Sequence, residues 1–589
     1  MAAAAGPVPA ASDAEDSGDD AVVTEVSVDA AVAASSAASS SGSGGRRKRT
    51  GPFRVHTAMC NGKSAKDLFS AVAEELGWPE VDVEARTSAS GSPKKSAKAT
   101  IYCVMQSNDM LDTLPVMNSR SWISRYVGMP DLCDKGTLAR IILACQDFAE
   151  EGEFSFSPKT WVLPDQLDDL RSKLEKSKKS KTYIVKPEDG SQGDGIFLVQ
   201  GIRDLDIKLS TKANKAAIVQ RYIEKPLLLG GLKFDFRVYV CLIGGSLQEL
   251  PRVFVCREGL GRLCTEAYEE PTSKNMHKSM AHLTNYSLNK RSDRFEHSGE
   301  SMDEVFSTAS TSSKRPMSVV LRQLQAEQPN FDPEAFYDQI VSLTQKTVAL
   351  MSPALVNFHR THCECSEMRS FQVLGFDVML DDRFFPYLLE VNNSPSLCID
   401  EALPLEPGAP GSEERGGRPG RAREKDKVCL CMDMAQPHWH QTSMVDLAVK
   451  KTVMIGAFRL LEQINAGVDE PFDENYVAAN VGDVQIYEFL RSIEAFYHSS
   501  GGAPKAFTSS GLRRALGAVC GTGGLQKHDL DSLSQRVRAT QFTSHDRQVK
   551  PDALRVYDFL DVLRQVGGRA FPGADPGDAV RGIMAAVGK

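Results

Sequence analysis

Long apolar runs are missing from this chain, and none approaches the roughly 20 residues that a helix needs to cross a bilayer. The first residues, Met1 to Ala11, are followed by acids rather than by a basic segment and an apolar core, so no secretory signal is predicted. The 13 cysteines are scattered without the spacing of a disulfide framework. We therefore expect a cytoplasmic protein with reduced thiols and no membrane insertion.

Two cysteine pairs, Cys363-x-Cys365 and Cys429-x-Cys431, come nearest to a metal-binding pattern. Their spacing differs from that of common structural zinc sites. Free thiols are therefore predicted at these positions.

An excess of positive charge is also missing. The chain has 69 Lys and Arg against 77 Asp and Glu, a formal net charge of −8, and no motif combines aromatic and basic residues, which disfavours a nucleic-acid partner. An acidic partner would have to be held by local basic patches. The candidates are a dense run of Arg171, Lys173, Lys176, Lys178, Lys179 and Lys181, and a smaller one of Lys94, Lys95 and Lys98. Each is equally compatible with a solvated helix end or loop.

The length of 589 residues exceeds the usual size of one hydrophobic core and predicts two or more domains. Residues 1–50 are rich in Ala, Ser, Gly and Asp, so a disordered tail is expected there. Residues 51–468 alternate strand-like and helix-like runs, an α/β (α+β) pattern, with a Pro- and Gly-rich inserted loop at about 404–426. Residues 469–589 are predicted to form a helical C-terminal extension, with one apolar helix face made by Ile486, Phe489, Leu490, Ile493 and Tyr497.

The most informative segment is 375–396, in which two apolar runs flank a polar turn, as is typical of a β-hairpin. If the turn is centred between Arg383 and Phe384, Asp377 lies directly opposite Glu390. Side chains opposite each other on paired strands have Cβ atoms roughly 5 Å apart, so both carboxylates could reach one cation.

Asn392 shares a strand face with Glu390, because side chains alternate along a strand. Two carboxylates and an amide oxygen form the hard-oxygen set that suits Mg²⁺. The alternative is a solvated hairpin with exposed acids, which the apolar neighbours of Glu390 disfavour.

An earlier segment combines a lysine with glycines. The apolar run 183–185 ends in Lys186, and a loop with Gly190, Gly193 and Gly195 leads into a second apolar run. A lysine supplies a point charge for phosphate, and glycines let backbone N–H groups approach phosphate oxygens. The strand–loop–strand order differs from the strand–loop–helix order of Walker-type loops, and an ordinary tight hairpin is the alternative.

Two further strands are predicted beyond this loop. Residues 218–226 form an apolar strand that breaks into a Pro-containing turn, where exposed backbone groups could pair with an adenine edge. In 230–239, Lys233, Asp235 and Arg237 share one face. Three charges in register on an internal strand are costly unless they line a site.

These residues resemble the tubulin tyrosine ligase-like family, whose catalytic core has the ATP-grasp fold. The resemblance covers about Phe53 to Asn465 and is closest to the polyglutamylase branch. It rests on five motifs in order, namely Lys-Pro-Glu-Asp-Gly-Ser-Gln-Gly-Asp-Gly-Ile, Gln-Arg-Tyr-Ile, Lys-Phe-Asp-Phe-Arg-Val-Tyr, His-Leu-Thr-Asn-Tyr-Ser-Leu-Asn-Lys and Leu-Glu-Val-Asn-Asn-Ser-Pro-Ser. The chain departs from the family pattern at Ser124 and Val127, where the family usually has Asn and Pro.

The resemblance implies a set of site residues. The implied ATP contacts are Lys135, Lys186, Gln192, Gly193, Gln220, Arg221, Tyr222, Ile223, Lys233, Phe234, Asp235, Thr284 and Asn285. The implied magnesium ligands are Asp377, Glu390 and Asn392, in agreement with the hairpin argument. The implied contacts with the incoming amino acid or the acceptor are Arg262, Ser287, Lys314 and Lys427. Lys186, Arg262 and Glu390 are the expected catalytic residues, whereas lone histidines such as His282 are expected to be structural.

By resemblance, the chain is expected to be an ATP- and Mg²⁺-dependent ligase that adds free L-glutamate to glutamate side chains of tubulin C-terminal tails on microtubules. An acceptor carboxylate would attack the γ-phosphate to give an acyl-phosphate, which the amine of the amino acid would then displace. The expected state is a monomer in the cytoplasm on the cytoskeleton, with a cilium or basal body as a further candidate location. A glycine ligase of the same fold and a catalytically silent microtubule adaptor are the alternatives.

Overall fold

The structure is a computed structural model of the 589-residue chain. It describes residues 51–60, 63–81, 98–105, 107–176, 181–188, 190, 193–210, 216–404, 438–499, 509–539 and 556–587. The predicted tail, most of the inserted loop and the basic residues Lys94, Lys95, Lys178 and Lys179 lie outside the described residues.

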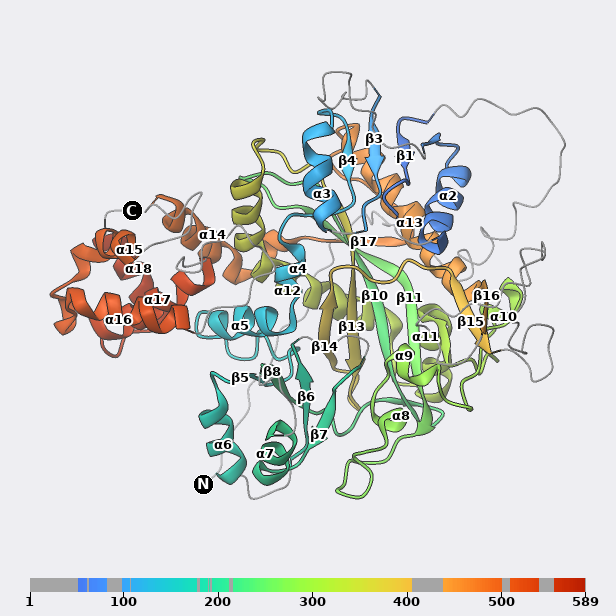
Figure 1. Cartoon of the computed structure of the whole chain (residues 1–589), viewed down its shortest axis with the longest axis horizontal. Coiled ribbons are helices and arrows are strands. Elements are labelled where there is room, and N and C mark those ends of the chain that lie inside the picture. Colours follow the sequence, from blue (N-terminus) through green and yellow to red (C-terminus); the bar gives the residue numbers. More distant parts are fainter. Residues whose placement is uncertain are drawn as a thin grey trace, which may run out of the picture. The chain divides into compact units, whose positions relative to one another are not determined.

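A seven-stranded antiparallel sheet forms the centre of the structure (Figure 1). Its main path runs in the order β12 (Lys314–Pro316), β11 (Arg252–Ala267), β10 (Leu232–Ile243), β13 (Phe371–Leu380) and β14 (Pro386–Asn392). Two short strands extend it, because β9 (Leu228–Leu229) pairs with β10 and β17 (Tyr476–Ala479) pairs with β11. The predicted strands at 236–242 and 375–380 are confirmed as parts of β10 and β13.

Smaller sheets flank this centre. The N-terminal one is parallel, in the order β2 (Glu80–Val81), β1 (Arg54–His56), β3 (Thr100–Tyr102) and β4 (Trp122–Ile123). A four-stranded antiparallel sheet has the order β5 (Thr160–Leu163), β8 (Ala217–Arg221), β6 (Tyr183–Pro187) and β7 (Phe197–Val199). A two-stranded sheet pairs β15 (Asp400–Pro404) with β16 (His438–Thr442), which flank the inserted loop.

Helices accompany each part of the chain. In the first half they are α2 (Lys63–Glu75), α3 (Ser107–Thr113), α4 (Met129–Leu132), α5 (Lys135–Gln146), α6 (Leu167–Lys176) and α7 (Ile202–Ser210). The middle of the chain adds α8 (Ser279–His282), α9 (Tyr286–Asn289), α10 (Met302–Val305), α11 (Met317–Glu327), α12 (Pro333–His362) and α13 (Met444–Asn465). The C-terminal helices are α14 (Gln485–Tyr497), α15 (Ser509–Leu516), α16 (Lys527–Ala539), α17 (Val556–Ala570) and α18 (Pro576–Ala586).

Strand β10 shows how the sequence pattern positions the site. Phe234, Phe236 and Val238 are buried in the largest hydrophobic core, which includes residues of α12 and of the C-terminal helices. The intervening Lys233 and Asp235 therefore point to the opposite face, towards β6 and α8. The alternation predicted for 230–239 is confirmed.

The C-terminal region differs from the prediction at its start. Residues 476–479 were expected to belong to a helical extension, but they form β17, which pairs with β11 of the central sheet. The segment contains Tyr476 and Val477, residue types that favour strands, and the edge of β11 offers unpaired backbone groups. Beyond β17, α14 buries Ile486, Leu490 and Ile493 in the same core as α12 and the central sheet, so this region is packed into the fold rather than appended to it.

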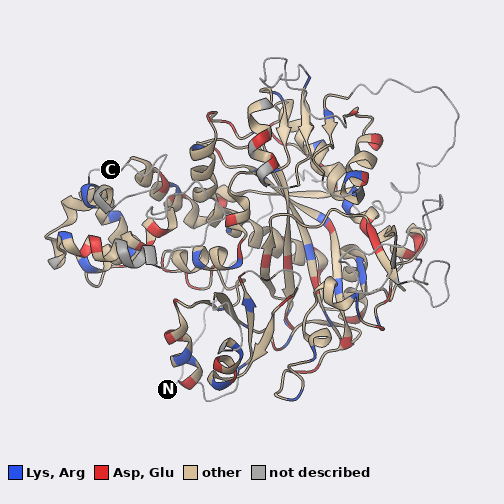
Figure 2. Ribbon diagram, in the orientation of Figure 1, with Lys and Arg blue, Asp and Glu red and all other residues tan. Residues whose placement is uncertain are grey.

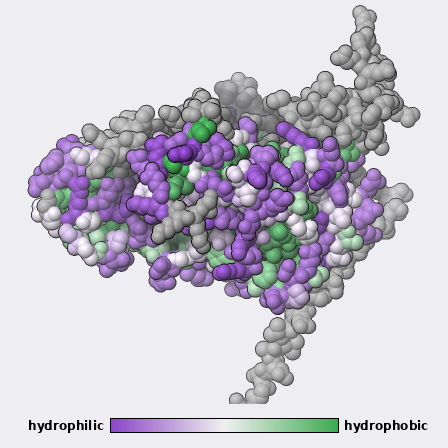
Figure 3. Space-filling model, turned by 90° about the horizontal axis from the view of Figure 1, so that it is seen from below, coloured by the Kyte–Doolittle hydropathy of each residue, from purple (hydrophilic) through white to green (hydrophobic). Residues whose placement is uncertain are grey.

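Charged residues of both signs are intermixed over the ribbon, including the central strands (Figure 2). One face of the molecule is mostly hydrophilic, with apolar residues gathered in small areas (Figure 3). Within the described residues, no helix combines the length and the apolar character that a bilayer crossing requires.

Candidate functional site

The β13–β14 hairpin places two acids opposite each other. Asp377 pairs with Glu390, as predicted, but Leu380 pairs with Pro386 and Val378 with Leu388, so the turn is centred on Arg383. Leu389 is the extra residue of a β-bulge that restores the Asp377–Glu390 pairing. The pairing is therefore confirmed, although the turn is one half-residue away from the predicted centre.

Two lysines face this hairpin from other elements. The Nζ atom of Lys186, on β6, is 3.0 Å from Oε1 of Gln220 and 3.3 Å from the carbonyl oxygen of Leu389. Lys135, the first residue of α5, donates to the carbonyl oxygen of Gly190 (3.0 Å), and its Nζ atom is 4.0 Å from Oε2 of Glu390. Burial lowers the pKa of Lys186, and the charge of Glu390 opposes this effect. Both lysines can thus meet a phosphate beside Glu390.

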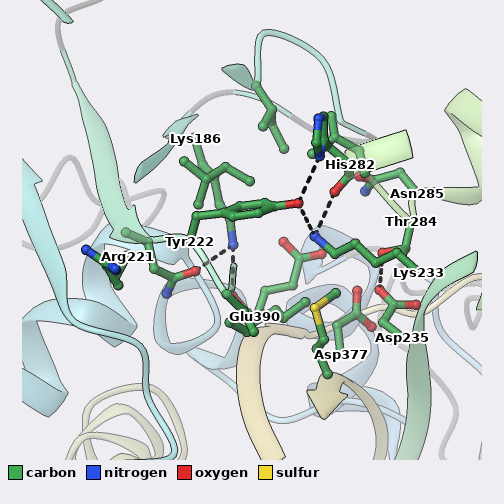
Figure 4. A pocket seen from close by; sticks show the side chains of 17 residues that line it. Lys186, Arg221, Tyr222, Lys233, Asp235, His282, Thr284, Asn285, Asp377 and Glu390 are labelled. Carbon is green, nitrogen blue, oxygen red and sulfur yellow. Dashed lines mark hydrogen bonds between the residues drawn. The ribbon is translucent and has the colours of Figure 1, made fainter. Parts of the chain in front are cut away.

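A hydrogen-bonded chain forms one wall of the cleft (Figure 4). Lys233 donates from Nζ to the hydroxyl of Tyr222 (2.7 Å) and to the carbonyl oxygen of His282 (2.9 Å). The Tyr222 hydroxyl is 3.1 Å from Nδ1 of His282, and Nε2 of His282 is 3.2 Å from the carbonyl oxygen of Asn275. Since the backbone carbonyl oxygen of Asn275 can only accept a hydrogen bond, Nε2 of His282 carries the proton, and Nδ1 of His282 accepts from the hydroxyl of Tyr222. Burial, followed by the charge of Lys233, lowers the pKa of His282 to about 4, which keeps the imidazole neutral.

Two arginines hold the acids of β10 and β13. Arg262, on β11, forms a bidentate pair with Asp235 (2.8 and 2.7 Å) and also lies 2.9 Å from Oδ2 of Asp377. Arg237 forms a second bidentate pair with Asp377 (2.5 and 3.1 Å). Burial alone would raise the pKa of Asp377, but the two guanidinium groups hold it well below its ordinary value. Asp377 is therefore ionised, and both of its carboxylate oxygens accept from the two guanidinium groups.

The described part of the glycine loop lies against α9. Gly193 has φ +86°, and a Cβ atom there would lie 2.8 Å from Cδ1 of Leu288 and 3.2 Å from the side chain of Asn285. Only glycine fits this left-handed position so close to its neighbours. The loop thus covers one side of the cleft.

The cleft lies between the sheet of β5–β8 and the central sheet. Its lining residues are Ile184, Lys186, Ile196, Gln220, Arg221, Tyr222, Ile223, Lys233, Asp235, His282, Leu283, Thr284, Asn285, Asp377, Met379, Leu389 and Glu390. Asn285, Asp377 and Glu390 also line a second, wider cavity of about 990 Å³. Arg237, Arg262, Ser287 and Asn392 line only the wider cavity, together with residues of the 394–402 segment and of β16. The two spaces therefore meet at the predicted metal ligands.

The donor set fits a magnesium ion. Asn392 uses its amide nitrogen towards Glu390 Oε1 (3.3 Å) and the carbonyl oxygen of Gly375 (3.4 Å), which leaves its amide oxygen as a ligand atom. Among the described residues there is no group of three His, Cys, Asp or Glu side chains placed to hold one metal ion, so a metal here would depend on two carboxylates, an amide oxygen and oxygens from water or phosphate. Mg²⁺ accepts such an incomplete protein shell.

Some predicted residues lie elsewhere. Phe234 was predicted to contact ATP, but its side chain is in the core beside Phe236, because it occupies the strand face opposite to Lys233. Lys314 is buried, ion-paired with Asp446 and stacked on Tyr286, and it does not line either space. Gln192 and Lys427 lie outside the described residues.

The structure also adds residues to the predicted set. Arg237 shares a strand face with Lys233 and Asp235, and this alternation was the available signal. His282 was predicted to be structural; its hydrogen bonds fit that interpretation, but its side chain lies in the cleft wall. The apolar lining residues Ile184, Ile196 and Met379 carry no sequence signal that separates them from core residues.

A lysine on a small antiparallel sheet facing carboxylates on a larger one, with a glycine loop beside the cleft, is typical of the ATP-grasp class of fold. Residues 118–405 match the model of the tubulin-tyrosine ligase family, and this part of the chain belongs to that family.

Curated relatives agree with this assignment. Human tubulin polyglutamylase TTLL11 is 38% identical over 293 residues, 49% of this chain and 39% of the relative. Mouse tubulin polyglutamylase TTLL6 is 35% identical over 298 residues, 50% of this chain and 34% of the relative. Tubulin polyglutamylase TTLL7 of Xenopus tropicalis is 35% identical over 292 residues, 48% of this chain and 30% of the relative. The matched part is thus less than half the length of each relative.

Proposed function

We propose that this chain is an ATP- and Mg²⁺-dependent ligase that adds glutamate to glutamate side chains in the acidic tails of tubulin. The observation that carries the proposal is the meeting of the narrow cleft and the wider cavity at Asp377 and Glu390. The cleft suits a nucleotide, the cavity has room for an amino acid and a peptide, and phosphoryl transfer requires the two to meet. The names of the relatives supply the substrate class.

The cleft offers each part of a nucleotide a partner. The adenine edge would pair with backbone groups at 220–223, where β8 ends. Beside them, Tyr222 and Lys233 are held in place by their shared hydrogen bond. Lys186 lines the cleft, and Lys135 lies beside it with its Nζ atom 4.0 Å from Glu390, so both would neutralise phosphate charge there. When bound between Asp377, Glu390 and Asn392, Mg²⁺ would neutralise further charge on the phosphate oxygens.

The reaction transfers the γ-phosphoryl group of ATP to an acceptor carboxylate, giving ADP and an acyl-phosphate. The amine of free glutamate then attacks the acyl carbon, and phosphate leaves as the C–O bond breaks and the amine loses a proton. Arg262 and Arg237 line the cavity beside Asp377, where a planar guanidinium can pair with a carboxylate of either substrate. The chain needs no nucleophilic side chain for these steps.

The test is incorporation of labelled glutamate, glycine or tyrosine into microtubules with Mg-ATP. Glutamate incorporation is expected, and Glu390→Gln should lower it by about 100-fold or more, because a charged ligand for the magnesium ion that neutralises the phosphates would be lost. Asp382→Asn is the matched control, since Asp382 is an exposed acid on the turn of the same hairpin. Chelation of Mg²⁺ should abolish incorporation.

Other outcomes separate the alternatives. Incorporation of glycine alone would keep the fold and the reaction but replace the amino acid. Binding of ATP and microtubules without any incorporation would contradict the ligase and favour a silent adaptor.

A further inference from the structure

Beyond Asn392, the segment 393–396 leaves the hairpin and lines the wider cavity with Ser394, Pro395 and Ser396. The reaction described above assigns no role to this segment. Its neighbour Arg125, just after β4, is 7% exposed, and within the described residues it has no carboxylate partner. Its guanidinium donates to the carbonyl oxygens of Ser124 (3.2 Å) and Met105 (3.4 Å) and to Oγ of Ser394 (2.8 Å). An arginine buried without a counter-ion is costly, and such a charge calls for an anion nearby.

Ser394 connects this charge to the cavity. Its side chain is exposed, and its oxygen accepts the hydrogen bond from Arg125. A serine hydroxyl has one hydrogen, and the described residues supply no acceptor for it. The hydroxyl therefore has a hydrogen to donate, and the guanidinium behind it makes it a stronger donor.

The pair is held in a fixed position. The buried Gln372 accepts from the backbone N–H of Tyr126 (2.8 Å) and donates to the carbonyl oxygen of Asn393 (2.5 Å). It thereby ties the residue after Arg125 to the residue before Ser394. A donor fixed by its surroundings loses little entropy when a ligand binds.

We propose that Ser394, oriented and polarised by Arg125, binds a carboxylate in the wider cavity. Ser394 is the binding residue and Arg125 is a positioning residue. The part of the cavity wall on β15 carries Asp400 and Glu401, which are held by His440 and His297 and would repel a carboxylate. A carboxylate is therefore favoured beside Ser394 over the part of the wall formed by these two acids.

This inference rests on the proposed function, which brings two carboxylate sources into the cavity. One is free glutamate, and the other is an acidic side chain of the acceptor tail. Both have the same chemistry at Ser394, and kinetics can distinguish them.

The experiment compares the full-length protein with Ser394→Ala. The KM for free glutamate, for microtubules and for ATP is measured with the other substrates saturating. Loss of a hydrogen bond to a charged group should raise the KM of one carboxylate substrate about tenfold, with kcat within about twofold and the KM for ATP unchanged. The substrate whose KM rises is the source of the carboxylate. An unchanged KM for both, or a change in the KM for ATP alone, would overturn the inference.

Ser366→Ala is the matched control, because Ser366 is an exposed serine that lines neither the cleft nor the wider cavity. Arg125→Gln should reproduce the KM change of Ser394→Ala, and the double variant should add nothing to it. Additive effects would show that Arg125 acts only on the fold.

Calorimetric titration with free glutamate and with an oligoglutamate peptide gives a readout that does not need turnover. Weaker binding of one ligand to Ser394→Ala than to wild type supports the inference even if wild type incorporates no amino acid, an outcome that would contradict the proposed function alone. Equal binding by both proteins contradicts the inference alone.

Discussion

Lys186 donates a 3.3 Å hydrogen bond to the carbonyl oxygen of Leu389, although 203 positions separate the two residues. Leu389 is the extra residue of the bulge in β14, so its carbonyl oxygen is free of the strand ladder. The bond joins the sheet of β5–β8 to the central sheet at the point where the cleft meets the wider cavity. The bulge therefore serves both the pairing of Asp377 with Glu390 and the placement of the lysine.

Lys186→Met should weaken ATP binding by at least about tenfold, because the charge that faces the phosphates is removed. Isothermal calorimetry with a non-hydrolysable ATP analogue measures the affinity. Lys159→Met is the control, since Lys159 is an exposed lysine next to β5 of the same sheet, stacked on Trp161. Equal losses in both variants would contradict a phosphate contact by Lys186.

Gly193→Ala should raise the KM for ATP about tenfold. An alanine at φ +86° is strained by roughly 1 kcal/mol, and its Cβ atom would collide with Leu288 at 2.8 Å, so the loop would have to lift from the cleft. Gly201→Ala is the control, because nothing lies within 4 Å of a Cβ atom there and its φ is not left-handed. A normal KM for ATP in Gly193→Ala would show that the loop does not cover the nucleotide.

The neutral state of His282 predicts a dependence of stability on pH. Its pKa is about 4 in the folded state, against about 6.5 in an unfolded chain, so the unfolded state binds the proton more readily between these values. The stabilisation is complete above about pH 6.5 and is lost as the pH falls towards 4, by about 3 kcal/mol in total. Urea unfolding of wild type and His282→Gln at several pH values isolates this contribution as the difference between the two profiles. His277→Gln, at an exposed histidine, should keep the wild-type profile.

The hairpin and β10 could be predicted from the sequence because alternation fixes which side chains share a face. The same rule could have excluded Phe234, which the family resemblance had included and which lies in the core. Motif resemblance assigns whole segments to a ligand, whereas strand geometry assigns alternate residues. At this position the structure places the side chain in the core, and the ATP contact stays a prediction.

Long-range pairing could not be predicted. The bulge at Leu389 leaves no trace in the hydrophobic pattern, and β17 is a four-residue run whose partner lies more than 200 positions earlier. The proximity of Arg125 to Ser394 could not be predicted either, because it depends on the N-terminal parallel sheet meeting the end of the β13–β14 hairpin. Such contacts follow from topology rather than from local sequence.

Glu494 ties the C-terminal helices to α12, and its truncation should destabilise the whole fold. Its carboxylate is 3% exposed and lies 2.6 Å from Arg491, 3.4 Å from Arg360 on α12 and 3.3 Å from Nε2 of His498. Removing one member of a buried ion-pair cluster leaves the remaining charges uncompensated, so Glu494→Ala should lower the free energy of unfolding by about 3 kcal/mol.

The matched control is Glu488→Ala, which removes an exposed glutamate from the same helix and should change stability by less than about 0.5 kcal/mol. Thermal and urea unfolding followed by both circular dichroism and loss of ATP binding make the comparison. Because α14 shares its core with α12 and the central sheet, the two signals should shift together in Glu494→Ala. Loss of helical signal at a lower temperature than loss of ATP binding would show instead that the C-terminal helices unfold as an independent unit.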